Sequence, residues 1–171
     1  ELQVLLKSLD LDGSFYGHAA SGLLHVRPVV DLHKAEDLVK YRRVADEVSH
    51  LVKRFKGSLS AEHGVGMART EYLPEHLGPE LMEATRTVKA LFDPKGMMNP
   101  GKILPDGRWR IDTNLRQGPD VRLALPFEPA LAFAAKDKSF VGNLEQCNGC
   151  GGCRKDAPVM CPTFVATGEE I

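Results

Sequence analysis

The sequence predicts an α+β fold in which an antiparallel sheet carries helices on one face. Two short apolar segments separated by a glycine-containing connection are typical of a β-hairpin. Two longer segments repeat apolar residues at three- and four-residue steps, which is typical of amphipathic helices. With 171 residues, of which 43% are hydrophobic and 26% are charged, the chain can form an ordinary globular core.

Charge and hydropathy argue against several classes of partner. The net charge of −1 gives no reason to expect a nucleic acid or an anionic membrane surface. No apolar run approaches the roughly 20 residues of a membrane-spanning helix, and no signal peptide opens the sequence. We therefore expect a cytoplasmic protein, with peripheral association at the inner membrane face as the alternative. Because an initiator Met is absent, we also expect a fragment of a longer protein.

The predicted hairpin places two histidines close together. Strands at residues 14–16 and 23–26, joined through residues 19–22, fold the chain back on itself. His18 and His25 then face one another across adjacent strands. On a single helix, the same seven-residue spacing would leave them too far apart along the axis to share an ion.

A long helix is predicted from Asp31 to about Lys56. Asp31 is the expected N-cap, and Gly57 is the expected stop. Its histidines, His33 and His50, are expected at the surface. The apolar stripe of this helix consists of Leu38, Tyr41, Val44, Val48, Leu51, Val52 and Phe55.

A second helix is predicted to open at Gly78-Pro79 and to end at Asp93-Pro94. His76, in the turn before it, is expected to be solvated. The apolar face of this helix consists of Leu81, Ala84, Val88 and Leu91.

Residues 58–62 are predicted to form a strand that delivers Glu62 and His63 to the histidine pair. Side chains alternate in direction along a strand, so one neighbour can bind a metal while the other projects beside it. Gly64 and Gly66 then permit a close backbone approach or a positive φ.

His18, His25 and Glu62 are the predicted metal ligands. Two imidazoles and one carboxylate are a common ligand set for a catalytic divalent ion that keeps a position open for substrate or water. The alternative is that these histidines are structural or simply exposed, as single histidines in strands usually are. From the residues alone the two readings are about equally supported.

Three motifs in this order resemble the C-terminal domain of FAD-linked oxidases of the vanillyl-alcohol oxidase type. That group includes D-lactate dehydrogenases, the flavin subunit of glycolate oxidase and D-2-hydroxyglutarate dehydrogenases. The resemblance covers roughly residues 10 to 104. It is carried by Gly17-His18 with Gly22 and His25, by Glu62-His63-Gly64 with Gly66, and by the segment from Phe92 to Lys102.

The resemblance implies a fold, cofactors and residue roles. It implies the later part of a ferredoxin-like α/β sandwich and an FAD held mainly by an upstream domain, so the fragment alone would be inactive. A divalent ion, Zn in the first place, would bind the substrate, with His63 as general base. Asn99 and Lys102 would lie near the flavin-domain junction, and Arg27 would bind a second substrate carboxylate.

Some positions depart from the family pattern. Many relatives have Asn where Leu23 stands and an acidic residue where Ser21 stands, and Arg27 occupies the place of a substrate-facing Asn. The sequence His25-Val26-Arg27-Pro28, with an iron–sulfur segment fused behind, resembles the large bacterial D-2-hydroxyglutarate dehydrogenases. The choice among D-2-hydroxyglutarate, D-lactate and glycolate stays open at this point.

All the cysteines lie in the last 25 residues, with the spacing Cys147-x2-Cys150-x2-Cys153-x7-Cys161-Pro162. This clustering favours a 4Fe–4S cluster in a reducing compartment. A four-thiolate zinc site is the first alternative, and disulfides are the second. The segment resembles the first half of a two-cluster ferredoxin-like domain, so we expect an incomplete cluster in this chain.

The predicted organisation is a substrate and metal domain at residues 1–104, a linker at 105–140 and a partial iron–sulfur segment at 141–171. Electrons would pass from FAD through the clusters to a quinone or another carrier. An exposed sheet edge favours self-association, such as a homodimer. The rival functions are an electron-transfer iron–sulfur subunit and a non-catalytic metal-binding module.

Overall fold

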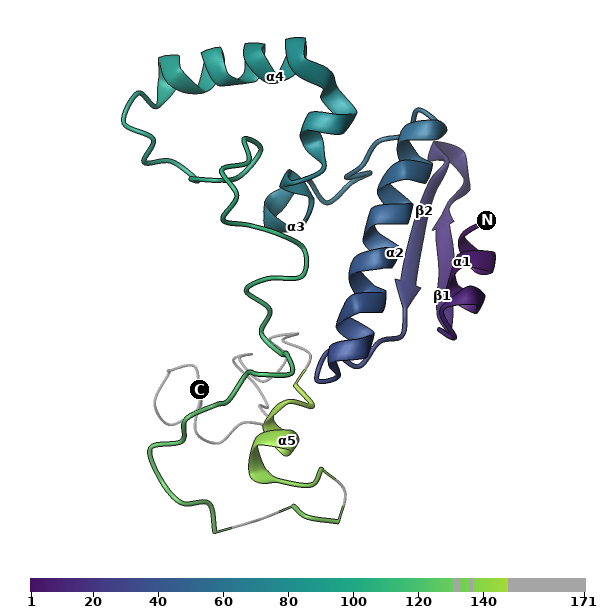
Figure 1. Cartoon of the computed structure of the whole chain (residues 1–171), viewed down its shortest axis with the longest axis vertical. Helices are drawn as coiled ribbons and strands as arrows, with labels where there is room; N and C mark the ends of the chain where they lie inside the picture. The colour runs from purple at the N-terminus through teal and green to yellow at the C-terminus, as the bar shows by residue number, and fades with distance from the viewer. Residues whose placement is uncertain (131–132, 136, 148–171) are drawn as a thin grey trace, which may run out of the picture. The chain divides into compact units, whose positions relative to one another are not determined.

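A computed structural model of the chain describes residues 1–130, 133–135 and 137–147. It combines helices with a two-stranded antiparallel sheet, which confirms the α+β fold class (Figure 1). None of the described helices is long and apolar enough to cross a membrane. The elements are α1 (Leu2–Ser8), β1 (Gly13–His18), the 3-10 turn η1 (Ala19–Ser21), β2 (Leu23–Pro28), α2 (Ala35–Arg54), α3 (Gly66–Thr70), α4 (Leu73–Phe92) and α5 (Phe140–Leu144).

The chain divides into two compact units, of which the first is Glu1–Val121 and the second begins at Arg122. The first unit contains α1 to α4 and the hairpin. In the second unit, Ser139 caps α5 by accepting a hydrogen bond from the Gly142 N–H at 2.9 Å. The predicted boundaries of the substrate and metal domain at residue 104, and of the linker at residue 140, stay predictions.

The predicted hairpin is confirmed. Strands β1 and β2 pair so that Tyr16 is opposite His25 and His18 is opposite Leu23. Gly22 ends the connecting turn in the left-handed region, with φ of 68°. Gly17 lies so close to the partner strand that a Cβ atom there would be 2.1 Å from the Leu23 carbonyl oxygen.

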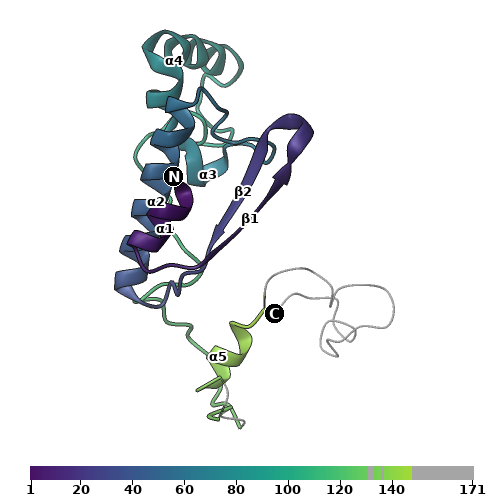
Figure 2. The same ribbon diagram turned by 90° about the vertical axis from the view of Figure 1, so that its right-hand side faces the viewer.

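Helices α1 and α2 lie on the same face of the hairpin (Figure 2). Their core consists of Leu6, Leu11 and Val44, against which Phe15 of β1 and Val48 of α2 pack. Because side chains alternate along a strand, the residues on either side of Phe15 point to the opposite face. The hairpin therefore turns its apolar side to the helices and its histidine side away from them.

Helix α2 begins later than predicted. Its N-cap is Lys34, so the prediction that Asp31 caps the helix is wrong. The Asp31 carboxylate instead accepts a hydrogen bond from the His33 N–H at 3.2 Å. The backbone N–H of Asp31 donates to Asp37 Oδ2 at 2.9 Å. At the other end Lys56, and not Gly57, takes the left-handed conformation, with φ of 54°.

The strand predicted at residues 58–62 is absent from the described structure, and this prediction is wrong. The segment forms bends and a turn, in which the His63 N–H donates to the Ser60 carbonyl at 3.2 Å. Ala61 has φ of 52°, which interrupts any extended conformation. The turn, and not strand alternation, therefore sets the directions of Glu62 and His63.

Helix α4 contains the predicted second helix and one earlier turn. Gly78, with φ of 77° and ψ of 172°, breaks it into two helical segments, and Pro79 starts the second as predicted. Its apolar face is uncovered within the first unit, since Leu81 is 57% exposed and Leu91 is 75% exposed.

Two histidine predictions hold and one holds only in part. His76 is partly exposed, and its Nε2 lies 2.9 Å from the hydroxyl of Ser49, a residue that is 1% exposed. His33 and His50 are exposed as predicted.

After α4 the chain returns to α3. The Ile103 N–H donates to the hydroxyl of the buried Thr70 at 2.9 Å. Further on, Trp109 Nε1 donates to the Pro100 carbonyl at 3.2 Å, which ties this segment back to the turn after α4. Residues 108–111 form no strand in the described structure, and the Ile111 N–H donates instead to Glu71 Oε1 at 2.7 Å.

Asp93 fixes the turn at the end of α4. Its carboxylate accepts hydrogen bonds from the N–H groups of Met97 at 2.9 Å and Met98 at 2.8 Å, and from the Lys89 ammonium group. The hydrogen bond from Lys89 is the largest cause that lowers the pKa of Asp93 below its ordinary value of 3.8.

We predict that Asp93→Asn lowers the urea midpoint of unfolding at pH 7, because the N–H groups of Met97 and Met98 and the ammonium group of Lys89 lose a charged acceptor. A carboxyl group with a lowered folded-state pKa stabilises the fold above the unfolded pKa and loses this effect as the pH falls through the folded-state pKa. The difference between the two proteins should therefore shrink below pH 3.8. An equal difference at pH 7 and pH 2.5 would contradict this role of the charge. Asp120→Asn, at an exposed position, is the control.

Candidate metal centre

The hairpin brings two histidines onto one face of the sheet. Tyr16 pairs with His25, and His18 follows Tyr16 by two residues, so His18 lies diagonally across from His25 on the same face. The centroids of the two imidazole rings are 5.5 Å apart. The side chain of His25 is 20% exposed and that of His18 is 61% exposed, so His25 is the more firmly held of the pair.

Glu62 reaches both imidazoles from the loop after α2. Its Oε1 atom lies 3.1 Å from His25 Nε2, and its Oε2 atom lies 3.8 Å from His18 Nε2. Candidate ligand atoms of all three residues lie within 4.8 Å of one another. The three predicted ligands therefore come together from two separate segments of the chain.

The donor set and its spacing fit a divalent metal ion. Zinc ligands lie at roughly 2.0–2.2 Å from the ion, which places neighbouring atoms of a tetrahedral shell about 3.3–3.6 Å apart. The separations of 3.1 and 3.8 Å lie on either side of this range. Two imidazoles and a carboxylate would leave a fourth position for substrate or water.

His63 lies beside the three candidate ligands. Its Nε2 atom is 2.9 Å from Glu62 Oε1, and its ring centroid is 6.0 Å from that of His25. When Nε2 carries the proton and donates to this carboxylate, Nδ1 is the ring atom that can accept another proton. The side chain is 67% exposed, so a small molecule can reach it.

The loop that carries Glu62 and His63 is held at its far end by Arg69. The Arg69 guanidinium donates through Nη1 to the Gly64 carbonyl at 3.2 Å. Gly64 has φ of 76°, a conformation that glycine adopts without strain. This turn and the hydrogen bond from α3 limit where the two functional side chains can point.

A partly buried charge cluster ties the loop region to α2. Arg42 Nη1 donates to both carboxylate oxygens of Glu71, at 2.8 and 2.9 Å, and lies 3.4 Å from Asp112 Oδ1. Burial acts to lower the pKa of Arg42, but hydrogen bonds with Glu71 and Asp46 raise it above its ordinary value. Arg42 therefore stays charged and fixes α2, α3 and residues 111–112 relative to one another.

The remaining predicted site residues lie in different places. Arg27 is on the histidine face, with its guanidinium carbon 5.0 Å from the centroid of the Tyr16 ring. Asn99 and Lys102 contact one another, at 3.3 Å between Oδ1 and Nζ. Cys147 is exposed near the end of the described residues. Cys150, Cys153 and Cys161 lie outside the described residues.

Sequence reasoning missed two residues that shape this site. Tyr16 stacks on His25, with ring centroids 4.8 Å apart, and also lies under Arg27. Its position two residues before His18 on a strand was a signal that it shares the histidine face. Arg69 holds the Gly64 turn, and no pattern in the sequence indicated this contact.

Comparison with known proteins identifies the family. Residues 1–103 match the family described as "FAD linked oxidases, C-terminal domain". The chain belongs to this family. The resemblance found from the three motifs is thus confirmed for the oxidase part of the chain, whereas the match does not extend to the cysteine segment.

Individual relatives of this FAD-linked oxidase domain agree. The chain is 35% identical to D-2-hydroxyglutarate dehydrogenase of Escherichia coli (strain K12), over 100% of this chain and 16% of that protein. It is 36% identical to D-lactate dehydrogenase of Anaerostipes hadrus, over 60% of this chain and 23% of that protein. It is 31% identical to glycolate oxidase subunit GlcD of Bacillus subtilis (strain 168), over 60% of this chain and 22% of that protein. The chain thus spans less than a quarter of each of these relatives.

We predict that Gly17→Ala destabilises the FAD-linked oxidase domain by about 1–3 kcal/mol, which is the usual cost of forcing extra atoms into a packed site. The added Cβ atom would be 2.1 Å from a backbone oxygen of β2, so the strands must separate next to His18. Chemical denaturation measures the free energy of unfolding.

Gly57→Ala is the matched control, because its added Cβ atom would meet Val52 at 3.4 Å, an ordinary contact distance. If both substitutions change the free energy of unfolding equally, the close approach of the two strands at Gly17 is not what holds the histidine pair.

Proposed function

We propose that this chain is the metal- and substrate-binding part of a flavin-dependent D-2-hydroxy-acid dehydrogenase. The observation that carries the proposal is the convergence of His18, His25 and Glu62, with ligand atoms within 4.8 Å and His63 beside them, in an FAD-linked oxidase domain. The family match favours this function over an electron-transfer subunit and over a non-catalytic metal-binding module.

D-2-hydroxyglutarate is the substrate that we propose first. Relatives named D-2-hydroxyglutarate dehydrogenase from Escherichia coli and Haemophilus influenzae match 100% of this chain. The D-lactate dehydrogenase and glycolate oxidase relatives match only 60% of it. The part of the chain beyond the oxidase domain is therefore shared with these two D-2-hydroxyglutarate dehydrogenases, although a third, from Stutzerimonas stutzeri (strain A1501), matches 55% of this chain. D-lactate and glycolate remain the alternatives.

The three ligand residues would hold a divalent ion, Zn in the first place. Such an ion lowers the pKa of a hydroxyl group that it binds and orients the neighbouring carboxylate. Glu62 spans both histidines, so it keeps the two imidazoles together. His25, stacked on Tyr16 and only 20% exposed, has the most restricted orientation of the group.

His63 is the proposed general base. Its Nε2–H donates to Glu62 Oε1, which leaves Nδ1 to accept the proton of the substrate hydroxyl. Imidazole suits this step near neutral pH. Arg27, on the same face as His25, would bind a substrate carboxylate through a charge-assisted hydrogen bond.

FAD would accept the hydride from the α-carbon. Most of its binding site would come from another part of a longer protein, with Asn99 and Lys102 of this chain at the junction. Cys147, Cys150, Cys153 and Cys161 have the chemistry of a 4Fe–4S ligand set, and the cluster would pass electrons to a quinone or carrier. A cytoplasmic location is part of this proposal.

We predict that His63→Ala in the intact flavoenzyme lowers kcat for D-2-hydroxyglutarate by about 100- to 10,000-fold, the usual contribution of a general base. Flavin and metal content should stay unchanged, because His63 is not one of the three ligands. Steady-state kinetics, flavin absorbance and metal analysis measure these quantities.

His50→Ala is the matched control, since this imidazole is 61% exposed and lies on α2 beside Glu75. Turnover of His63→Ala close to that of the unsubstituted enzyme would eliminate His63 as the base.

A further inference from the structure

A cavity of about 330 Å³ opens next to His63, and none of its described lining residues belongs to the hairpin. It is lined by the loop at residues 63–65, by α3, by Tyr41 of α2, by Arg110 and Ile111, and by residues 113–115. Its volume lies at the lower end of the range of small-molecule sites, roughly 300–1,000 Å³. His63 thus lines this cavity and also contacts Glu62, one of the candidate metal ligands.

The walls of the cavity favour an anion. Arg69 and Arg110 both line it, and no aspartate or glutamate is among its described lining residues. Within the described chain, Arg69 has no carboxylate partner and makes one hydrogen bond, to the Gly64 carbonyl. Burial, the largest cause, and the charge of Asp112 raise the pKa of Tyr41, which also lines the cavity, while the charge of Arg69 acts to lower it.

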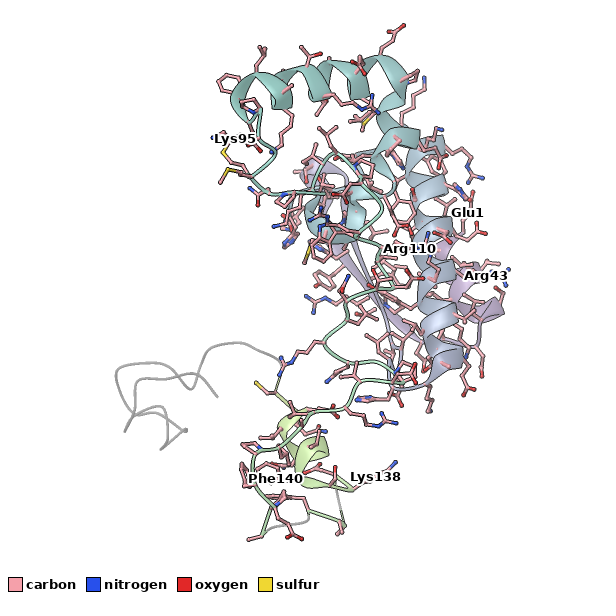
Figure 3. All side chains as sticks on the ribbon, turned by 60° about the vertical axis from the view of Figure 1, so that its left-hand side comes forward. Glu1, Arg43, Lys95, Arg110, Lys138 and Phe140 are labelled. Atoms are coloured by element: carbon pink, nitrogen blue, oxygen red, sulfur yellow. The ribbon has the colours of Figure 1, made fainter. Side chains whose placement is uncertain are left out.

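Arg110 is held in place by the carboxylate of Asp112. It lies on the segment that runs beside α2, where its Nε donates to Asp112 Oδ1 at 3.2 Å (Figure 3). The same oxygen also contacts Arg42 at 3.4 Å, so one carboxylate is shared by two guanidinium groups. The Ile111 N–H donates to Glu71 Oε1 at 2.7 Å, which fixes the backbone next to Arg110.

We propose that this cavity binds the second carboxylate of a 2-hydroxy dicarboxylic acid, through Arg69 and Arg110. The inference rests on the proposed function, in which the hydroxyl group and the first carboxylate are at the metal ligands. In 2-hydroxyglutarate the second carboxylate is three carbon–carbon bonds beyond the hydroxyl-bearing carbon. A substrate bound beside His63 can therefore extend this carboxylate into the adjoining cavity.

This arrangement would make Arg110 a specificity residue. Paired guanidinium groups bind a carboxylate by charge-assisted hydrogen bonds, and a monocarboxylic acid such as D-lactate has no group to place there. This assignment replaces the expectation that Arg27 binds the second carboxylate, and Arg27 would instead bind the first one, next to the reacting carbon. Substitution of Arg110 should therefore affect only dicarboxylic substrates, whereas substitution of Arg27 should affect monocarboxylic and dicarboxylic substrates alike.

The test compares Arg110→Gln with the unsubstituted flavoenzyme, using D-2-hydroxyglutarate and D-lactate as substrates. We expect kcat/KM for D-2-hydroxyglutarate to fall by about 10- to 100-fold, mainly through KM, because one charged contact to the substrate is lost. For D-lactate it should change by less than about twofold. Arg108→Gln is the matched control, since this exposed arginine pairs with Asp106 and does not line the cavity.

A binding measurement separates this inference from the proposed function. The affinity of the purified enzyme for glutarate, which cannot be oxidised at a hydroxyl group, should fall by about tenfold or more in Arg110→Gln. An enzyme that oxidises neither hydroxy acid but loses glutarate affinity in this variant would refute the proposed function and support the cavity.

Three results would overturn the inference. Equal losses for D-2-hydroxyglutarate and D-lactate would show that Arg110 acts on the fold of the site. Unchanged kinetics and glutarate affinity would show that the second carboxylate binds elsewhere. A loss of bound FAD in Arg110→Gln would show that the cavity holds a flavin phosphate.

Discussion

The pairing of β1 with β2 is the constraint on which the site depends. With Tyr16 opposite His25, His18 and His25 share one face, and a shift of a single residue would send one of them toward α1 and α2. The apolar residues of the other face prevent that shift, because Phe15 packs against Leu6, Leu11 and Val44. The core of this small unit thus determines which side chains can meet Glu62.

Glu62 arrives by a different physical route. Its loop has no ladder hydrogen bonds and is defined by single contacts, namely the left-handed conformation of Ala61, the turn at Ser60 and the hydrogen bond from Arg69 to Gly64. Such a loop is held by fewer backbone hydrogen bonds than the paired hairpin. Metal and substrate would therefore bind between the hairpin and this loop.

Much of this could be predicted from the sequence, and the failures have physical reasons. The hairpin follows from alternation around Gly17 and Gly22, and the convergence of the ligand residues from the motifs that contain them. The strand predicted at residues 58–62 does not form, because Ala61 has a positive φ that nothing in this mixed polar and apolar segment indicates. The Asp31 cap failed because that carboxylate pairs locally with His33. The hydrogen bond between His76 and Ser49 depends on tertiary packing.

The proposed function requires that His18, His25 and Glu62 bind one metal ion. Anomalous X-ray diffraction from crystals of the intact protein, with data collected on both sides of the zinc absorption edge, tests this directly. We expect an anomalous peak roughly 2.0–2.2 Å from a nitrogen of each histidine and from a Glu62 oxygen. Fully bound metal at the cysteines, with no peak between the two histidines and Glu62, would contradict it.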